Sequence, residues 1–296
     1  MRKSITFTSK GVPCRGWLYV PDDLAEGQKA TTIVMAHGFT GVKEMILPDF
    51  AEQFATAGFV TLAFDYRYFG DSEGEPRNQL FPLHQVEDIR NAITWVSDQP
   101  EVDPQRIGLW GTSYGGAIVV YTATFDKRVK AVVAQVPATM SLEFRRAMNP
   151  DGWEQMHKFL LQDRIERYKT SAVSYLKVVA SEGEPCVLPG KEAYEAYMVL
   201  AATSPNWRNQ VSIESLEQTQ QFDPVSFVHW IAPTALLLIA AEKDSLIPVE
   251  AVREAYERAR EPKALSVLPI QHFEIYDEPW LSKAASIAID WFKKYL

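Results

Sequence analysis

The chain has 296 residues, of which 47% are hydrophobic and 23% charged, a composition that excludes a disordered or fibrous protein. Its formal net charge of -8 argues against nucleic acid or an anionic membrane as a partner, because both require an excess of lysine and arginine on one face. We therefore expect a small-molecule partner, and the length allows either one α/β domain or one domain with an insertion.

The N-terminal residues and the two cysteines bear on location and redox state. The first residues alternate between polar and apolar side chains and contain no apolar run long enough for a signal peptide or a membrane span. Cys14 and Cys186 are far apart and fit no metal-ligand pattern. We expect a cytoplasmic protein with two isolated thiols, and the sequence leaves self-association open.

In chain order, strand patterns alternate with helix patterns. Residues 5–8 and 14–20 suit an antiparallel pair at a sheet edge, and residues 31–36 form a continuous β-favouring run. A helix over 48–57, a strand over 59–64 and a helix face over 86–96 follow. Strands over 107–110 and 129–136 flank a further helix that starts near residue 116.

The next apolar strand, residues 235–241, begins about a hundred residues later, too far for an ordinary connection. We interpret residues 138–231 as a helical cap, with helices over 153–168, 172–180 and 191–202, inserted into a core of residues 1–137 and 232–296. A helix over 249–259, a strand over 264–268 and a helix over 279–295 complete the chain. The pattern predicts an α/β fold with a doubly wound, mostly parallel sheet and helices on both faces.

The segment 106–116 reads RIGLWGTSYGG, an apolar strand that runs into a GxSxG turn and a helix start. This arrangement is typical of a nucleophile elbow, in which Gly111 and Gly115 allow the close backbone approach and Ser113 is exposed at the corner.

A serine nucleophile needs a base within hydrogen-bond distance and a third group that orients the base. Among five histidines, His272 follows the final strand, at the carboxyl edge where ligands collect in open α/β sheets, and is the expected base. His37 ranks second, with a structural role near its loop favoured for it. After strand 235–241 we choose Asp244 over Glu242 as the orienting acid, which gives the order Ser113, Asp244, His272.

The same edge should supply hydrogen-bond donors for a developing oxyanion. We expect these to be the backbone amides of Tyr114, directly after the nucleophile, and Phe39, at the tip of an early strand. Asp65 and Arg67 are expected to form an ion pair that braces the loop at 65–74. We expect neither a metal site nor a cofactor, because the histidines are scattered and form no spaced ligand set.

These motifs resemble the α/β-hydrolase superfamily, and within it the branch of dienelactone hydrolases and acetyl xylan esterases. The resemblance rests on residues 37–39, 65–67, 70–72 and 111–116, on Asp244 with Pro248, and on His272 with Phe273. It covers nearly the whole chain except the cap, and it implies a serine acyl-enzyme mechanism on carboxylic esters. The resemblance also extends to relatives that transfer or hydrolyse polyketide acyl thioesters.

Dienelactone hydrolases usually carry cysteine as the nucleophile, so Ser113 favours an esterase-like function. The leading hypothesis is thus a serine esterase acting on a small-molecule ester. The alternatives are an acyltransferase or thioesterase acting on acyl or polyketide thioesters and, from another class, a non-catalytic binding protein with a hydrolase fold. Epoxide hydrolase or haloalkane dehalogenase chemistry is disfavoured, because it would need a carboxylate nucleophile in the position that Ser113 occupies.

Overall fold

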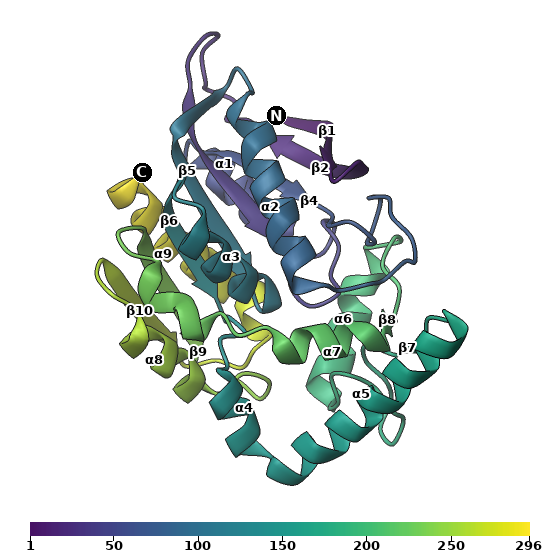
Figure 1. Ribbon diagram of the computed structural model, residues 1–296. Helices are drawn as coiled ribbons and strands as arrows, with labels where there is room; N and C mark the ends of the chain where they lie inside the picture. Colours follow the sequence, from purple (N-terminus) through teal and green to yellow (C-terminus); the bar gives the residue numbers. More distant parts are fainter.

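The computed structural model describes residues 1–296, and a sheet of eight strands lies at its centre (Figure 1). The strands are β1 (Arg2–Ser9), β2 (Val12–Tyr19), β3 (Ala30–Ala36), β4 (Val60–Phe64), β5 (Val102–Thr112), β6 (Val129–Gln135), β9 (Ala235–Ala241) and β10 (Lys263–Leu268). Their order across the sheet is β1-β2-β4-β3-β5-β6-β9-β10. Only the β1–β2 and β2–β4 pairings are antiparallel, so the predicted edge pair and the mostly parallel sheet are confirmed.

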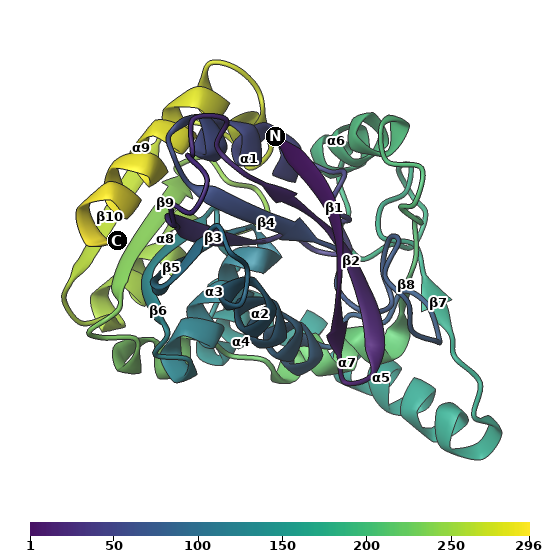
Figure 2. The same cartoon turned by 90° about the horizontal axis from the view of Figure 1, so that it is seen from above.

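Helices cover both faces of this sheet (Figure 2). One face packs against α1 (Leu47–Thr56) and α9 (Trp280–Tyr295), and the other against α2 (Pro82–Ser97), α3 (Tyr114–Phe125) and α8 (Val249–Arg258). Along β3, the side chains of Ile33 and Met35 pack on the face covered by α1 and α9, while those of Val34 and Ala36 pack on the opposite face. Successive side chains of a strand point to opposite faces, so burial of both faces explains why this strand is apolar throughout.

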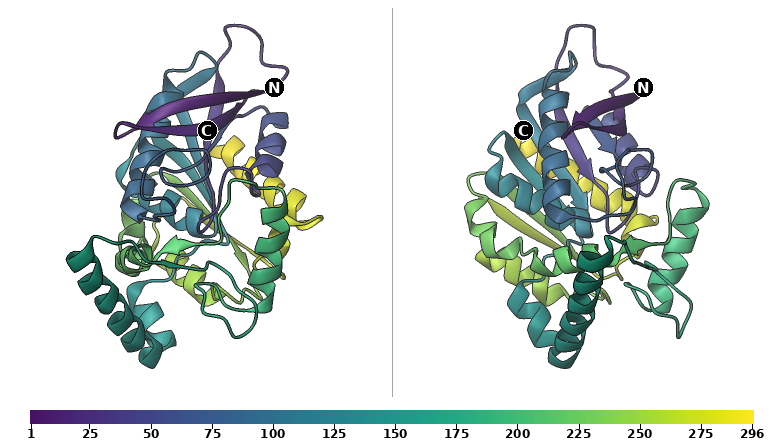
Figure 3. Two further views of the ribbon diagram at one scale, coloured as in Figure 1. Left: turned by 90° about the vertical axis from the view of Figure 1, so that its right-hand side faces the viewer. Right: turned by 45° about the vertical axis from the view of Figure 1, so that its right-hand side comes forward.

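The segment between β6 and β9 holds α4 (Leu142–Met148), α5 (Pro150–Thr170), β7 (Tyr175–Leu176), α6 (Lys191–Ala202), β8 (Val211–Ser212), α7 (Ile213–Gln221) and the 3-10 helix η1 (Val225–Trp230). The helices α4 to α7 gather at one end of the sheet, below the strands in Figure 1, and α5 projects from the body (Figure 3). A second short 3-10 helix, η2 (Glu274–Tyr276), precedes α9.

The predicted helix over residues 172–180 is wrong. Helix α5 ends at Thr170, and the next residue, Ser171, has a left-handed φ of 57°. The chain then runs extended into β7, which pairs with β8. Tyrosine and valine favour extended backbone, and the amides of Val178 and Val179 both donate to Asn209 Oδ1 at 3.0 Å. The asparagine side chain thus satisfies two amides that a helix would have bonded within itself.

Two further features answer questions raised by the sequence. None of the helices combines the length and apolar character that crossing a bilayer requires. Cys14 and Cys186 are both free thiols, as expected.

Candidate active site

Ser113 occupies the sharp turn between the end of β5 and the start of α3. Its φ of 54° and ψ of -121° are strained for a residue that carries a Cβ atom. A Cβ atom on Gly111 would lie 2.3 Å from the carbonyl oxygen of Gly115, and one on Gly115 would lie 2.3 Å from that of Ala36. Only glycine fits at both positions, which explains the GxSxG spacing around an exposed serine.

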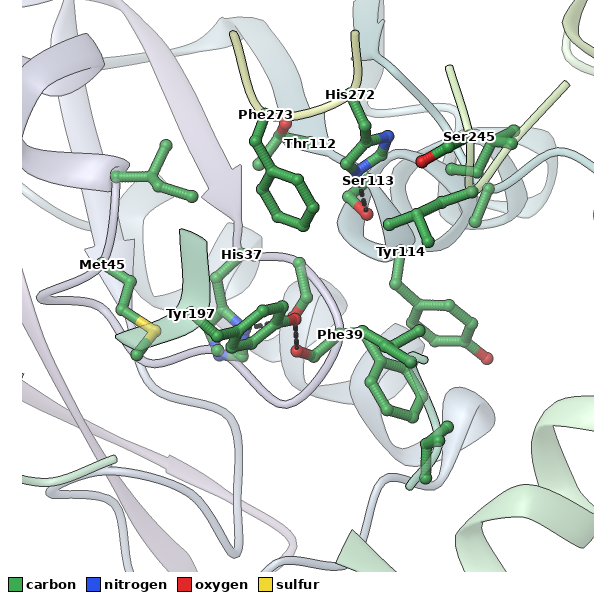
Figure 4. Close-up of a pocket in the computed structure, with 18 of the residues that line it drawn as sticks. His37, Phe39, Met45, Thr112, Ser113, Tyr114, Tyr197, Ser245, His272 and Phe273 are labelled. Atoms are coloured by element: carbon green, nitrogen blue, oxygen red, sulfur yellow. Dashed lines mark hydrogen bonds between the residues drawn. The ribbon is translucent and has the colours of Figure 1, made fainter. Parts of the chain in front are cut away.

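Loops that follow β9 and β10 bring Asp244 and His272 to this serine. His272 Nε2 lies 3.1 Å from Ser113 Oγ (Figure 4), and His272 Nδ1 lies 2.6 Å from Asp244 Oδ2. The side chains of His272 and Asp244 are only 1% and 2% exposed. The three residues expected from the sequence therefore lie in one hydrogen-bonded chain, in which the side chains of the histidine and the aspartate are buried.

The Asp244 carboxylate is also fixed from its other side. Its Oδ1 accepts hydrogen bonds from the amides of Leu246 at 2.9 Å and Ile247 at 2.8 Å. Glu242, the rejected alternative, is exposed. Because both carboxylate oxygens are held, Asp244 can fix the orientation of the His272 ring and stabilise a positive charge on it.

Two backbone amides stand beside the serine. The amide of Phe39 donates to no acceptor within the protein. Tyr114 is the first residue of α3, where a helix leaves its amides without an intrahelical acceptor. Gly38 packs against the serine, since a Cβ atom built on it would lie 3.3 Å from Ser113 Cβ. Neither amide thus has a hydrogen-bond acceptor within the protein.

These groups open into one cavity of about 460 Å³, which is lined mainly by apolar side chains. Its walls come from the loops after β3, β5, β9 and β10 and from the segment between β6 and β9. The lining residues are His37, Gly38, Phe39, Gly41, Met45, Ile46, Thr112, Ser113, Tyr114, Ala138, Met140, Arg145, Val187, Leu188, Pro189, Tyr197, Leu200, Thr219, Gln220, Ser245, Leu246, Ile247, His272, Phe273 and Tyr276. A volume of this size suits a small organic molecule.

Two polar residues of this cavity were missed by sequence reasoning. Tyr197, from α6, donates its hydroxyl hydrogen to the carbonyl oxygen of Phe39 at 2.7 Å (Figure 4). Arg145, from α4, also lines the cavity. No motif marks either residue. Both belong to the segment between β6 and β9, and the sequence does not show which side chains of its helices face the cavity.

None of the other histidines forms a hydrogen bond with the serine hydroxyl. His37 is buried, its Nδ1 lies 3.1 Å from the carbonyl oxygen of Gly38, and burial lowers its pKa to about 4. It is therefore neutral at pH 7 and braces the turn that carries Phe39, the structural role favoured for it. His84, His157 and His229 lie on α2, α5 and η1, outside the cavity lining.

The expected ion pair between Asp65 and Arg67 is wrong. Asp65 pairs with Lys43 at 2.8 Å, whereas Arg67 turns to α2 and pairs with Asp88 at 2.6 Å. All four side chains are at most 4% exposed. Asp65 and Asp88 therefore belong to separate buried ion pairs. A buried charge needs a partner of opposite charge, and here tertiary packing supplies each partner from a distant part of the chain.

One cluster of acids has spacing that a metal ion could use. Carboxylate oxygens of Glu44, Asp65 and Asp71 lie within 4.8 Å of one another. The ammonium group of Lys43 contacts all three, at 2.9, 2.8 and 2.5 Å. A protein cation thus fills the centre of this cluster.

With the fold and this geometry established, comparison with known proteins gives the class. Residues 31–278 match the α/β hydrolase fold family, and the chain belongs to it. The superfamily resemblance seen in the motifs is confirmed, while the dienelactone hydrolase and acetyl xylan esterase branch stays a prediction.

Particular relatives span almost the whole chain. The quorum-quenching protein AidA of Acinetobacter baumannii is 32% identical over 292 residues, which cover 98% of this chain and 94% of AidA. The thiohydrolase aneE of Aspergillus aculeatus is 32% identical over 265 residues, 87% of this chain and 81% of aneE. The crystal structure of the α/β hydrolase GrgF from Penicillium sp. sh18 is 29% identical with a TM-score of 0.86, covering 100% of this chain and 99% of GrgF.

Proposed function

We propose that the protein is a serine hydrolase that cleaves carboxylic esters through an acyl-enzyme intermediate. The observation that carries this proposal is the hydrogen-bonded chain from Ser113 Oγ to His272 Nε2 at 3.1 Å and from His272 Nδ1 to Asp244 Oδ2 at 2.6 Å. The strained elbow at Ser113 and the buried position of the other two side chains support the same roles.

In the first half-reaction His272 Nε2 takes the hydroxyl proton as Ser113 Oγ bonds to the ester carbonyl carbon. The carbon–oxygen bond to the alcohol then breaks, and His272 returns the proton to the departing alkoxide. In the second half-reaction water gives its proton to His272 and its oxygen to the acyl carbon. The bond to Ser113 Oγ breaks, the serine recovers its proton and a carboxylic acid leaves.

Both half-reactions place negative charge on the former carbonyl oxygen. The amides of Phe39 and Tyr114 are the proposed donors to this oxyanion. In a cavity shielded from water, one such donor typically contributes a factor of about 10² to 10³ in kcat. Ordered amides of a turn and a helix start need no rearrangement to act in this way.

Residues 138–231 are the proposed cap over the site. They contribute Met140, Arg145, Leu188, Tyr197 and Leu200 to a cavity whose reacting groups all come from the core. The mainly apolar wall suits the acyl or alcohol part of a small ester, so this segment is expected to select the substrate.

A second candidate is hydrolysis or transfer of an acyl group from a thioester. It is favoured by relatives with that chemistry in their names: the thiohydrolase aneE, and the polyketide transferase grgF of Penicillium sp, which is 30% identical over 270 residues, 90% of this chain and 87% of grgF. The same acyl-enzyme would form from a thioester, and an alcohol acceptor in place of water would turn hydrolysis into transfer.

The variant Ser113→Ala tests the proposal, with Ser245→Ala as a matched control. Ser245 lines the same cavity but donates its hydroxyl hydrogen to Glu192 Oε2 at 2.7 Å. Ser113→Ala should abolish turnover of a short-chain p-nitrophenyl ester and labelling by a fluorophosphonate, with an unchanged unfolding midpoint. Ser245→Ala should retain both. Full residual activity in folded Ser113→Ala would refute the nucleophile, and failure of the wild type to label would favour a non-catalytic binding protein.

A panel of esters, thioesters and amides of graded acyl length then separates the two candidates. Higher kcat/KM for esters supports the esterase. Higher kcat/KM for thioesters supports the alternative, and consumption of an added alcohol in preference to water identifies a transferase.

A further inference from the structure

Arg145 is the only lining residue of the cavity with a permanent charge. It projects from α4 toward the C-terminal end of α7. Its two terminal nitrogens donate to the backbone carbonyl oxygens of Thr219 at 3.2 Å, Gln220 at 3.3 Å and Phe222 at 3.1 Å. These contacts explain how the guanidinium is oriented, but none of them neutralises its charge.

Two of the five N–H donors of this guanidinium are unused, and one of them is on Nε. Arg145 Nε is buried and has no hydrogen-bond partner. The nearest acid in sequence on that side, Asp223, accepts instead from the amides of Leu142, Val225 and Ser226 at 3.0 to 3.1 Å. Arg145 is half-buried and forms no ion pair, and burial lowers its pKa although the nearby charge of Asp223 raises it, so a carboxylate ligand would stabilise this cation.

Further unpartnered polar atoms surround the same part of the wall. The hydroxyl of Tyr114 and Oε1 of Gln220 are both buried without a hydrogen-bond partner. The ring of Tyr114 lies 6.3 Å from that of Phe222, whose carbonyl holds Arg145. Burial raises the pKa of Tyr114, with the Arg145 charge acting against it, so the hydroxyl is a donor at neutral pH. Tyr114 follows Ser113 directly and its ring points away from the serine (Figure 4), so this polar region lines the same cavity at a distance from the reacting groups.

We propose that Arg145 Nε and the Tyr114 hydroxyl form a carboxylate-binding subsite, so that the preferred substrate is an ester or thioester that also carries a free carboxylate. This inference rests on the proposed function. A carboxylate can accept both hydrogen bonds and neutralise the arginine, whereas a neutral carbonyl can only accept them.

The overall charge of the protein makes the inference specific. With a formal net charge of -8, the long-range field repels anions, so general electrostatic attraction cannot favour an anionic substrate. A preference for a carboxylate must therefore come from a cation at the site, and Arg145 is the one that the cavity offers.

The test compares p-nitrophenyl monoesters of adipic, pimelic and suberic acid with the same esters in which the free carboxylate is replaced by a primary amide. These chain lengths limit intramolecular attack by the carboxylate on the ester, and each pair differs in charge while size stays nearly constant. A second panel places the carboxylate or amide on the phenol of phenyl acetate. The measured quantity is the ratio of kcat/KM for the acid to that for the amide.

In the wild type we expect a ratio of about 10 to 100 for at least one pair, from one charge-assisted pairing. Arg145→Gln should lower the ratio to about 1, and Arg145→Lys, which keeps the charge, should retain part of it. Arg146→Gln removes an exposed arginine from the same helix and should leave the ratio unchanged. A purely structural role for Arg145 would lower activity on acid and amide equally.

The outcomes separate this inference from the proposed function. A wild type that turns over the amides with a ratio near 1 in both panels overturns the carboxylate subsite and leaves the hydrolase intact. A high ratio that persists in folded Arg145→Gln also overturns it. A wild type that hydrolyses no member of either panel and is not labelled at Ser113 refutes the proposed function itself. As a readout independent of catalysis, suberate should bind to Ser113→Ala about tenfold more tightly than to the double variant Ser113→Ala with Arg145→Gln.

Discussion

Replacing Tyr197 with phenylalanine should slow the chemical step while leaving substrate binding nearly unchanged. The hydroxyl of this residue donates to the carbonyl oxygen of Phe39 at 2.7 Å, and the amide of Phe39 is a proposed oxyanion donor. Tyr197 is 7% exposed, and burial raises its pKa, so the hydroxyl stays protonated. Tyr197 touches none of the proposed reacting atoms and acts as a positioning residue.

The size of the effect follows from the hydrogen bond that is lost. Leaving a buried carbonyl without its partner costs about 1–3 kcal/mol. Complete loss of an oxyanion donor would lower kcat by about 10² to 10³, and here the donor is displaced while the amide itself remains. If about half of the lost free energy reappears in the transition state, kcat falls about 3- to 10-fold. KM should change less than about twofold, because the hydroxyl faces Phe39 and leaves the cavity wall in place.

The chain offers a matched control in Tyr175, whose hydroxyl donates to the backbone carbonyl oxygen of Arg77 at 3.0 Å outside the cavity. Tyr175→Phe removes the same kind of hydrogen bond and should leave kcat unchanged. Steady-state kinetics should be paired with inhibition by an alkyl boronic acid, whose adduct with Ser113 mimics the tetrahedral intermediate. Its affinity should weaken by the same factor as kcat in Tyr197→Phe. A folded Tyr197→Phe variant with wild-type kcat and wild-type boronate affinity would refute the positioning role.

Three further predictions concern the stability of the backbone and the buried polar groups around the site. Gly115→Ala should destabilise the protein by more than about 3 kcal/mol, since the new Cβ atom would lie 2.3 Å from a carbonyl oxygen of β3; Gly183→Ala, with no atom within 4 Å but a φ of 89°, should cost only about 1 kcal/mol in the same thermal unfolding assay. The pKa of His37 is lowered from 6.5 to about 4, so the unfolded chain binds the proton first and stability falls as pH drops through this window. Urea unfolding should show that the wild type loses about 2 kcal/mol more than His37→Asn between pH 7 and pH 5, and equal losses would contradict the assignment. Arg67→Met leaves the carboxylate of Asp88, 1% exposed, without its cation and should cost about 3–5 kcal/mol, part of which Asp88→Asn in the same chain should restore; a cost below about 1 kcal/mol would argue against the pair.

The parts of the site that sequence reasoning reached are those set by local backbone geometry. Ser113 is marked by glycines two positions away on each side, and the structure shows that a Cβ atom at either position would collide with backbone. Asp244 follows the continuous apolar strand β9 and His272 follows the short strand β10, and parallel strands bring their carboxyl ends to one edge. The residues that were expected because they follow a strand of the sheet therefore lie together in the structure.

The parts that it missed depend on packing between distant segments. Asp65 and Arg67 are near neighbours in sequence, but their partners are Lys43 and Asp88, each more than 20 residues away. The segment 172–180 was expected to be helical, yet Asn209, about 30 residues further along, holds its amides in an extended conformation. Neither partner can be found from the local pattern, because tertiary contacts decide which of several adequate local conformations is stabilised.

The core (residues 1–137 and 232–296) and the proposed cap (residues 138–231) contribute different groups to the cavity, and this links substrate binding to the reaction rate. The groups proposed to react with substrate all come from loops of the core, whereas Arg145 and Tyr197 come from helices of the insert. Tyr197 holds the carbonyl of the residue whose amide is a proposed oxyanion donor, so a shift of α6 would displace that donor as well. A substrate that holds α6 in place would thus also hold the Phe39 amide in place as an oxyanion donor. A substrate that fits poorly against α6 would lose kcat as well as affinity. Selectivity in this protein should accordingly be expressed in kcat as well as in KM.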